Sequence, residues 1–137
     1  MFDLNQINVP ELSGRSVFEE LRRGLVVALL QMNQEMDSMV AASRVEGSPL
    51  YVVKHRIASK GERKDYFSLR WRRRFSDTQH LHVLWVDQVE VLDVMQPVVR
   101  KHYEGLNRRM LELNVLSSMV RHDLNALETF FKRSGSV

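Results

Sequence analysis

Nine basic side chains lie in one short stretch near the middle of the chain, where the only acidic residues are Glu62 and Asp65. The stretch from Lys54 to Arg74 therefore has a net charge of +7, and the rest of the chain has −4. Arginine and lysine bind phosphate oxygens, and arginine can also contact guanine through two parallel hydrogen bonds. The candidate nucleic-acid-binding residues are Lys54, Arg56, Lys60, Arg63, Lys64, Arg70, Arg72, Arg73 and Arg74.

The histidines offer a second kind of chemistry. His80 and His82 are two positions apart, a spacing that can place two imidazoles on one zinc ion. No third ligand follows at a suitable spacing, and the alternation of its strand predicts His55 on the opposite face of the sheet. We therefore expect no metal site, and interpret these histidines as exposed or phosphate-facing.

Motifs for enzymatic chemistry are absent from the sequence. It has no phosphate-binding glycine-rich loop, dinucleotide fingerprint, serine-hydrolase elbow or zinc-protease motif. With no cysteine, it can form no disulfide, iron–sulfur cluster or cysteine nucleophile. The acidic residues are scattered, without a pair placed for acid–base work. We predict a protein that is not an enzyme and needs no cofactor.

The chain carries no pattern for membrane insertion or export. Its longest apolar run, residues 25–30, is far shorter than the ~20 residues that span a bilayer. Residues 1–6 lack the basic and apolar regions of a signal peptide. Together with the absence of cysteine, these features predict a cytoplasmic location and no contact with a membrane.

A long amphipathic helix is predicted near the start of the chain. Residues 1–14 are polar and are expected to form a flexible arm. Ser16 and Glu19 then have the spacing of a helix capping box. Apolar residues recur every three or four positions over 16–42, which predicts a helix whose methionines serve as core filler. Those methionines are Met32, Met36 and Met39.

The middle of the chain changes from a helical period to strict alternation. Alternating apolar and polar residues predict strands over 51–57, 66–73 and 80–85, which together form a basic antiparallel sheet over 51–85. The connections are short and polar, and the first contains Gly61.

A second long helix is predicted after the sheet. A helical pattern of apolar residues begins near residue 87 and continues to residue 133. Pro97 either kinks this helix or begins a new one. Its apolar residues keep the four-three spacing typical of helices that pair along their length. We therefore predict a homodimer, with the dimerisation residues Leu106, Met110, Leu113, Val120, Leu124 and Leu127.

These elements predict a single α+β domain over residues 1–137, in the order α-β-β-β-α. If both helices align with the strands on one face, three antiparallel strands make the helices run parallel to each other, and both extend beyond the sheet. Their overhanging stripes are then buried against each other or against a second subunit. The residues expected to face the helices are Val53, Ile57, Phe67, Leu69, Trp71, Leu81, Val83 and Trp85. The opposite face is then expected to carry Lys54, Arg56, Ser68, Arg70, Arg72, His80 and His82, with the other basic residues at its edges and in the hairpin loop.

Two resemblances bear on function. Residues 66–72, together with residues 102–114, resemble a family of small proteins of integrative and conjugative elements, some of which are integrase regulators. That resemblance implies an accessory role in a bacterial mobile element. The order α-β-β-β-α is also similar to the double-stranded-RNA-binding domain, although the helices here are much longer and the second lacks a lysine-rich start.

One face of the predicted sheet is almost purely basic, whereas a face that is merely solvated usually mixes charges of both signs. We therefore predict a regulatory protein that binds nucleic acid, with DNA favoured, through this face. The alternative is an interaction module or inhibitor whose basic sheet binds an acidic protein partner.

Overall fold

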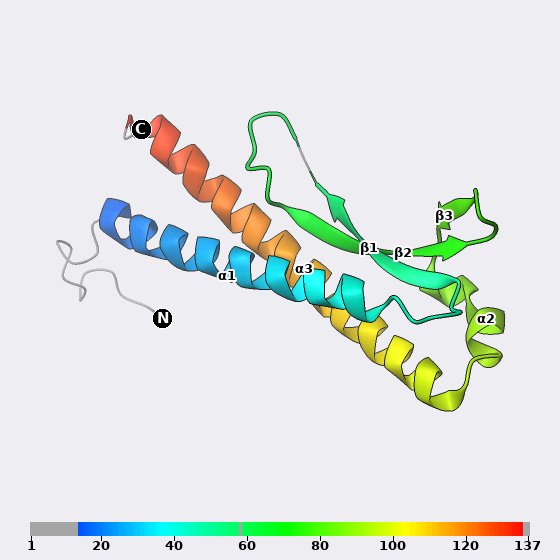
Figure 1. Ribbon diagram of the computed structural model, residues 1–137. Coiled ribbons are helices and arrows are strands. Elements are labelled where there is room, and N and C mark those ends of the chain that lie inside the picture. Colours follow the sequence, from blue (N-terminus) through cyan, green and yellow to red (C-terminus); the bar gives the residue numbers. More distant parts are fainter. Residues whose placement is uncertain (1–13, 58, 136–137) are drawn as a thin grey trace.

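The computed structural model, which describes residues 14–57 and 59–135, contains two long helices and a three-stranded antiparallel sheet (Figure 1). The predicted α+β fold class and element order are confirmed; the arm predicted over 1–14 lies almost entirely outside the described residues. In chain order the elements are α1 (Gly14–Ala42), β1 (Leu50–Arg56), β2 (Phe67–Arg74), β3 (His80–His82), the 3-10 turn η2 (Trp85–Asp87), α2 (Val89–Asp93) and α3 (Pro97–Arg133).

Three predicted boundaries need correction. Ser16 lies inside α1 rather than at its cap. The third strand ends at His82 instead of residue 85, and the chain then turns through η2 and α2. Pro97 occupies the first turn of α3, where its missing N–H costs nothing, so it begins a new helix and does not kink an older one.

The two long helices run antiparallel, and the prediction of parallel helices is wrong. Arg109 of α3 forms a two-pronged ion pair with Glu35 of α1, at 2.5 and 2.7 Å. Nearer the other end, the rings of Phe18 and Phe130 are 4.7 Å apart. Because β3 is short, η2 and α2 return the chain to the end of the sheet where α1 finishes, and α3 starts there (Figure 1).

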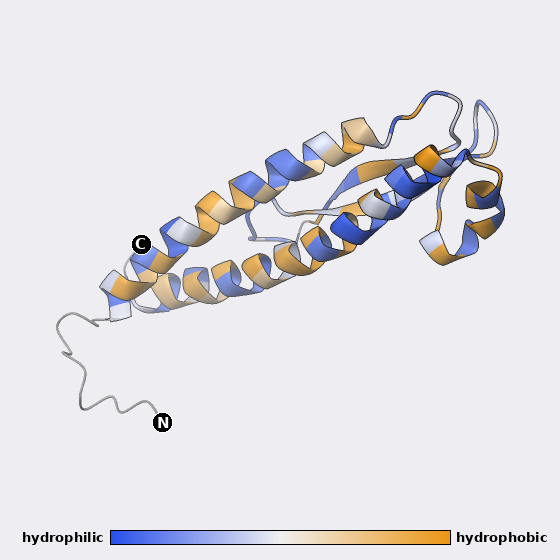
Figure 2. Cartoon of the chain, turned by 90° about the horizontal axis from the view of Figure 1, so that it is seen from below, coloured by the Kyte–Doolittle hydropathy of each residue, from blue (hydrophilic) through white to orange (hydrophobic). Residues whose placement is uncertain are grey.

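The ends of the helices that project beyond the sheet pack against each other (Figures 1 and 2). The Arg22 guanidinium lies 4.4 Å from the centre of the Phe131 ring and 3.7 Å from the Glu128 carboxylate. Further along, Leu29 and Leu124 are fully buried in the protein's core. Of the two arrangements predicted for the overhanging stripes, the structure thus shows mutual burial within one chain.

The residues predicted to form a dimer interface lie within the protomer. Leu113 and Leu124 have no exposed surface, and only Leu106 is as much as partly exposed. The full set is Leu106, Met110, Leu113, Val120, Leu124 and Leu127. Their four-three spacing is satisfied by α1 and the sheet, so these side chains are not available on the surface for a second copy. The predicted methionine stripe of α1 is confirmed as core.

Polar side chains of α3 complete the edge of β2 beyond β3. The amide of Asn114 accepts a hydrogen bond from the backbone N–H of Leu69 at 2.7 Å and donates one to its carbonyl at 2.9 Å. Ser117 donates to the carbonyl of Phe67 at 2.8 Å. Since a buried backbone group needs a partner, these side chains replace the missing continuation of β3.

Candidate nucleic-acid interface

The strand register determines which side chains share a face of the sheet. Residues directly opposite each other point the same way, and Val52 is paired with Trp71 while Val53 is paired with Arg70. Both long helices cover the Val52 face, and no helix of the described chain covers the other (Figure 1). We call the uncovered side the open face; it carries Tyr51, Val53, His55, Ser68, Arg70, Arg72, Arg74, His80 and His82.

The predicted faces of β1 are therefore reversed. Lys54 lies on the helix side, with its ammonium 3.1 Å from the Asp37 carboxylate and 4.2 Å from the centre of the Phe67 ring. A lysine can bury its aliphatic stem and still pair its charge. Arg56 shares that side, where its Nε donates to the Lys64 carbonyl at 3.0 Å. Val53 lies on the open face, whereas the prediction placed it toward the helices.

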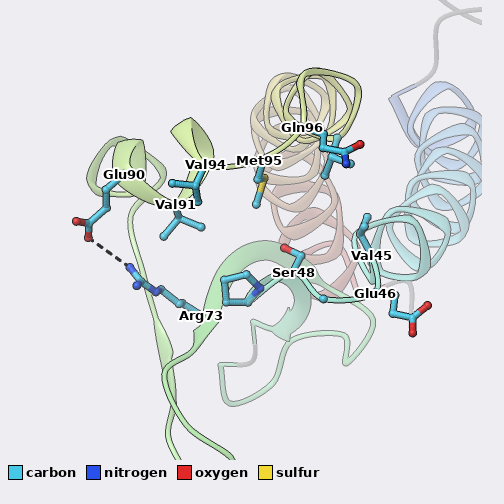
Figure 3. A pocket seen from close by; sticks show the side chains of 12 residues that line it. Val45, Glu46, Ser48, Arg73, Glu90, Val91, Val94, Met95 and Gln96 are labelled. Atoms are coloured by element: carbon cyan, nitrogen blue, oxygen red, sulfur yellow. Dashed lines mark ion pairs between the residues drawn. The ribbon is translucent and has the colours of Figure 1, made fainter.

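Arg73 also belongs to the helix side of the sheet. It points toward α2, where its guanidinium is 3.8 Å from Glu90 and 3.3 Å from the Gln88 side-chain oxygen (Figure 3). Arg73 and Glu90 border a hollow of about 870 Å³ between the α1–β1 loop and α2, whose remaining walls include several apolar side chains. Those side chains are Val45, Val91, Val94, Met95 and Val99. Arg73 thus neutralises a local carboxylate and does not reach the open face.

Three arginines of β2 lie together on the open face. Arg70 is exposed, and it has no hydrogen bond or ion pair with any described residue. Arg72 is half-buried and donates to the His80 carbonyl at 2.6 Å, which holds its guanidinium along the sheet. Arg74 is exposed and pairs with Asp77 in the adjoining turn. None of the strand residues is acidic, so the positive charge of this face is opposed only from the loops around it.

All three histidines of the sheet lie on the open face, and the prediction that His55 faces the other way is wrong. The rings of His55 and His82 are 6.4 Å apart, and the Nδ1 of His80 is 2.5 Å from the Tyr51 hydroxyl. Within residues 14–57 and 59–135, no group of three His, Cys, Asp or Glu side chains could hold a metal ion.

Arg44 is a residue of this site that the sequence pattern missed. It follows α1 in a loop, and its guanidinium lies 4.1 Å from the centre of the Tyr51 ring. Together with Arg74 and His80 it lines a hollow of about 330 Å³. Arg44 reaches Tyr51 only because the loop after α1 folds back over the strand. The alternation of apolar and polar residues within a strand could not predict that contact.

The basic hairpin loop between β1 and β2 is tied to α3. Arg63 is neutralised by Asp65 through two hydrogen bonds of 3.0 and 2.9 Å. Lys60 and Lys64 are exposed and form no ion pair within the described part of the chain. The Glu62 carboxylate accepts two hydrogen bonds from Arg121, at 2.8 and 2.7 Å, and one from Asn125.

The hydrogen bonds from Arg121 and Asn125 lower the pKa of Glu62 to about 2, from an ordinary value of 4.5. Between these two pH values the unfolded state binds more protons at this residue than the folded state, so its stabilising contribution is present above 4.5 and is lost as pH falls toward 2. We expect Glu62→Gln to flatten the dependence of melting temperature on pH in that window. Calorimetry at several pH values measures this.

Glu46→Gln is the matched control, because Glu46 is an exposed loop residue without an ion pair among the described residues. It should leave the acid limb of the melting-temperature profile like that of the wild type. A Glu62→Gln profile that parallels the wild type down to the lowest pH would contradict the assigned role of the pairing with α3.

The structure thus brings together only part of the predicted binding set. Arg70, Arg72 and Arg74 share the open face, while Lys60, Arg63 and Lys64 lie in the hairpin loop. Lys54, Arg56 and Arg73 lie on the helix side. Four of the nine have acidic partners, which reduces the charge offered to a ligand: Lys54, Arg63, Arg73 and Arg74.

Comparison with known proteins yields no relationship. Searches of family models, of curated proteins and of solved structures each gave no match to this chain. The resemblance to proteins of integrative and conjugative elements therefore stays a prediction. Among the described residues, no helix has the length and apolar character required to cross a membrane.

Proposed function

We propose that the protein binds nucleic acid, with DNA favoured, through the open face of its sheet. The observation that supports this most directly is the gathering of Arg70, Arg72 and Arg74 on a face that is not covered by any helix of the described residues and to which the strands contribute no acidic residue. Arg44 adds a fourth guanidinium at the edge of that face. An accessory or regulatory role in a bacterial mobile element remains part of the proposal, on the strength of the resemblance alone.

The geometry of the face suits a phosphate backbone. Arg70 has no competing acidic partner among the described residues, and Arg72 is anchored through one nitrogen, which limits the side-chain entropy lost on binding. Arg44, Arg74 and His80 line one hollow, which Glu46 also borders, so two guanidinium groups and an imidazole lie where a phosphate could bind. Because the hairpin loop is tied to α3 through Glu62, Lys60 and Lys64 extend the positive surface from a fixed base.

The test is a fluorescence-anisotropy titration of labelled duplex DNA, single-stranded DNA and RNA over a range of salt concentrations. Each phosphate contact on duplex DNA contributes about −0.9 to the slope of log affinity against log salt. Four contacts, from Arg44, Arg70, Arg72 and Arg74, predict a slope near −4 per chain, by the same relation. Replacing Arg70 and Arg72 together by alanine should weaken binding and reduce the slope by about two.

The matched control is Arg23→Ala with Lys101→Ala, which removes the same net charge from exposed positions on the two helices. It should retain the wild-type slope to within a few tenths. If the control and the open-face variant lose affinity equally, binding reflects net charge alone and the site is wrong. If anisotropy stays flat for all three nucleic acids at about 50 mM salt, nucleic-acid binding is excluded and the acidic protein partner becomes the better hypothesis.

A further inference from the structure

The outer face of α3 carries an apolar stripe that no part of the described chain covers. Leu111, Val115 and Met119 are 56%, 60% and 59% exposed, and they follow each other at four-residue spacing. Residues four apart lie above one another on a helix, so the three form one continuous strip. It faces away from the buried side of α3, which is formed by Met110, Leu113, Ser117 and Val120.

The strip is widened by the turn that follows β3. Leu84 is 67% exposed, and it lines a shallow hollow of about 450 Å³ together with Leu111. Leu116 is 42% exposed and lies one position after Val115. Single exposed apolar residues are ordinary, whereas a contiguous group of this kind marks an interaction surface.

The charges at the two ends of the strip identify its occupant. Arg108 lies about one turn before Leu111 and has no ion pair with a described residue. Asp123 lies about one turn after Met119, and among the described residues it pairs only with the side chain of His122, at 3.5 Å. The strip is therefore positive at one end and negative at the other, so it is complementary to a reversed copy of itself.

We propose that the chain forms a homodimer through antiparallel pairing of the outer face of α3, with a two-fold axis near Val115. In this pairing Val115 meets its own copy, Leu111 meets Met119, and Arg108 meets the His122–Asp123 end. A parallel pairing would set Arg108 against Arg108 and Asp123 against Asp123, which repel each other. The smaller Val115 at the centre lets the two helix axes approach, while larger side chains fill the space on either side.

The surface of this dimer differs from the predicted one. The four-three stripe of α3 is occupied by α1 and the sheet, so the partner contacts residues roughly opposite to it on the helix. The paired region from Arg108 to Asp123 is roughly 23 Å long at 1.5 Å per residue. Arg70 and His82 of the open face also line the hollow beside Leu84. The paired residues from Arg108 to Asp123 all belong to α3, so crosslinking between two copies of α3 tests the dimer separately from nucleic-acid binding.

The absence of cysteine from the sequence allows a direct test by single cysteine substitutions. Val115→Cys should form a disulfide-linked dimer on mild oxidation, because a residue at the axis lies beside its copy. Leu111→Cys and Met119→Cys should each stay uncrosslinked alone, since the copies are separated by about 12 Å along the helix axis, beyond the reach of a disulfide. A mixture of the two, with one protein carrying a larger tag, should give the mixed dimer.

Leu30→Cys is the matched control. Leu30 is 53% exposed, much like the residues of the strip, but it lies on α1, and the residue one turn later, Gln34, is polar, so the strip does not continue there. It should not crosslink. Sedimentation equilibrium should give twice the chain mass of 16.1 kDa for the wild type and the single mass for a folded Val115→Lys variant. Self-crosslinking of Leu111→Cys would overturn the antiparallel register, and a monomeric wild type at high micromolar concentration would overturn the dimer.

Discussion

Replacing Leu113 by lysine is expected to abolish the folded state. Leu113 has no exposed surface, and it belongs to the core cluster that α1, the sheet and α3 share. An unpaired ammonium there costs several kcal/mol, which is comparable with the whole stability of a small domain, about 5–15 kcal/mol. Circular dichroism should show loss of the cooperative thermal transition.

The matched control lies two residues further along the same helix. Val115→Lys introduces the same side chain at a position that is 60% exposed, so this variant should still fold and melt in one cooperative transition, although as a monomer. A Leu113→Lys protein that melts cooperatively near the wild-type temperature would show that this face of α3 is not the core.

Replacing Asn114 by leucine is expected to lower the free energy of unfolding by about 2–6 kcal/mol, because two buried backbone groups lose their partner. The substitution keeps the branched shape and the number of heavy atoms of the side chain but removes both hydrogen bonds to the backbone of Leu69, a residue that is only 2% exposed. Each buried backbone group left without a partner costs about 1–3 kcal/mol. Denaturant titration of the variant and the wild type measures the difference.

Gln34→Leu is the control for the change from amide to leucine, because Gln34 is exposed on α1. It should change the free energy of unfolding by no more than about 0.5 kcal/mol. If Asn114→Leu is equally mild, the edge of β2 must find another partner, and the account of why β3 can end at His82 fails.

These experiments separate three sides of one helix. The buried side of α3 packs against α1 and the sheet, through residues such as Leu113. The side bearing Asn114 completes β2, together with Ser117 at the margin of the buried side. The outer side, centred on Val115, is the proposed surface for a second copy. Changes on the three sides should therefore affect folding, sheet stability and assembly separately.

The sequence alone was sufficient to predict the number, type and order of the main elements. A period near 3.6 at each end and alternation in the middle are local signals, because the spacing of apolar residues follows directly from the geometry of a helix or strand. The same reasoning predicted the methionine core of α1. It also predicted that Arg70 and Arg72 lie on one face of the sheet and Leu69 and Trp71 on the other. In β2 one set of alternate residues is mainly large and apolar and the other is mainly arginine, so only the apolar set can face the core.

The sequence was ambiguous in β1, because each alternate set contains apolar residues. The tertiary structure buries Val52 and leaves Val53 on the open face, and Asp37 of α1 supplies a partner for Lys54 on the helix side. That partner lies 17 residues earlier in the chain and is brought near only by packing. No local pattern contains this information.

The direction of α3 and the reach of Arg44 were likewise decided by tertiary structure. Counting strands predicts parallel helices, but β3 ends once Asn114 can occupy the edge of β2, and η2 and α2 then return the chain to the other end of the sheet. Arg44 joins the open face because its loop places the guanidinium over Tyr51. Local periodicity determines which side of an element is apolar, whereas long-range contacts determine what each side meets, because they depend on residues far apart in the sequence.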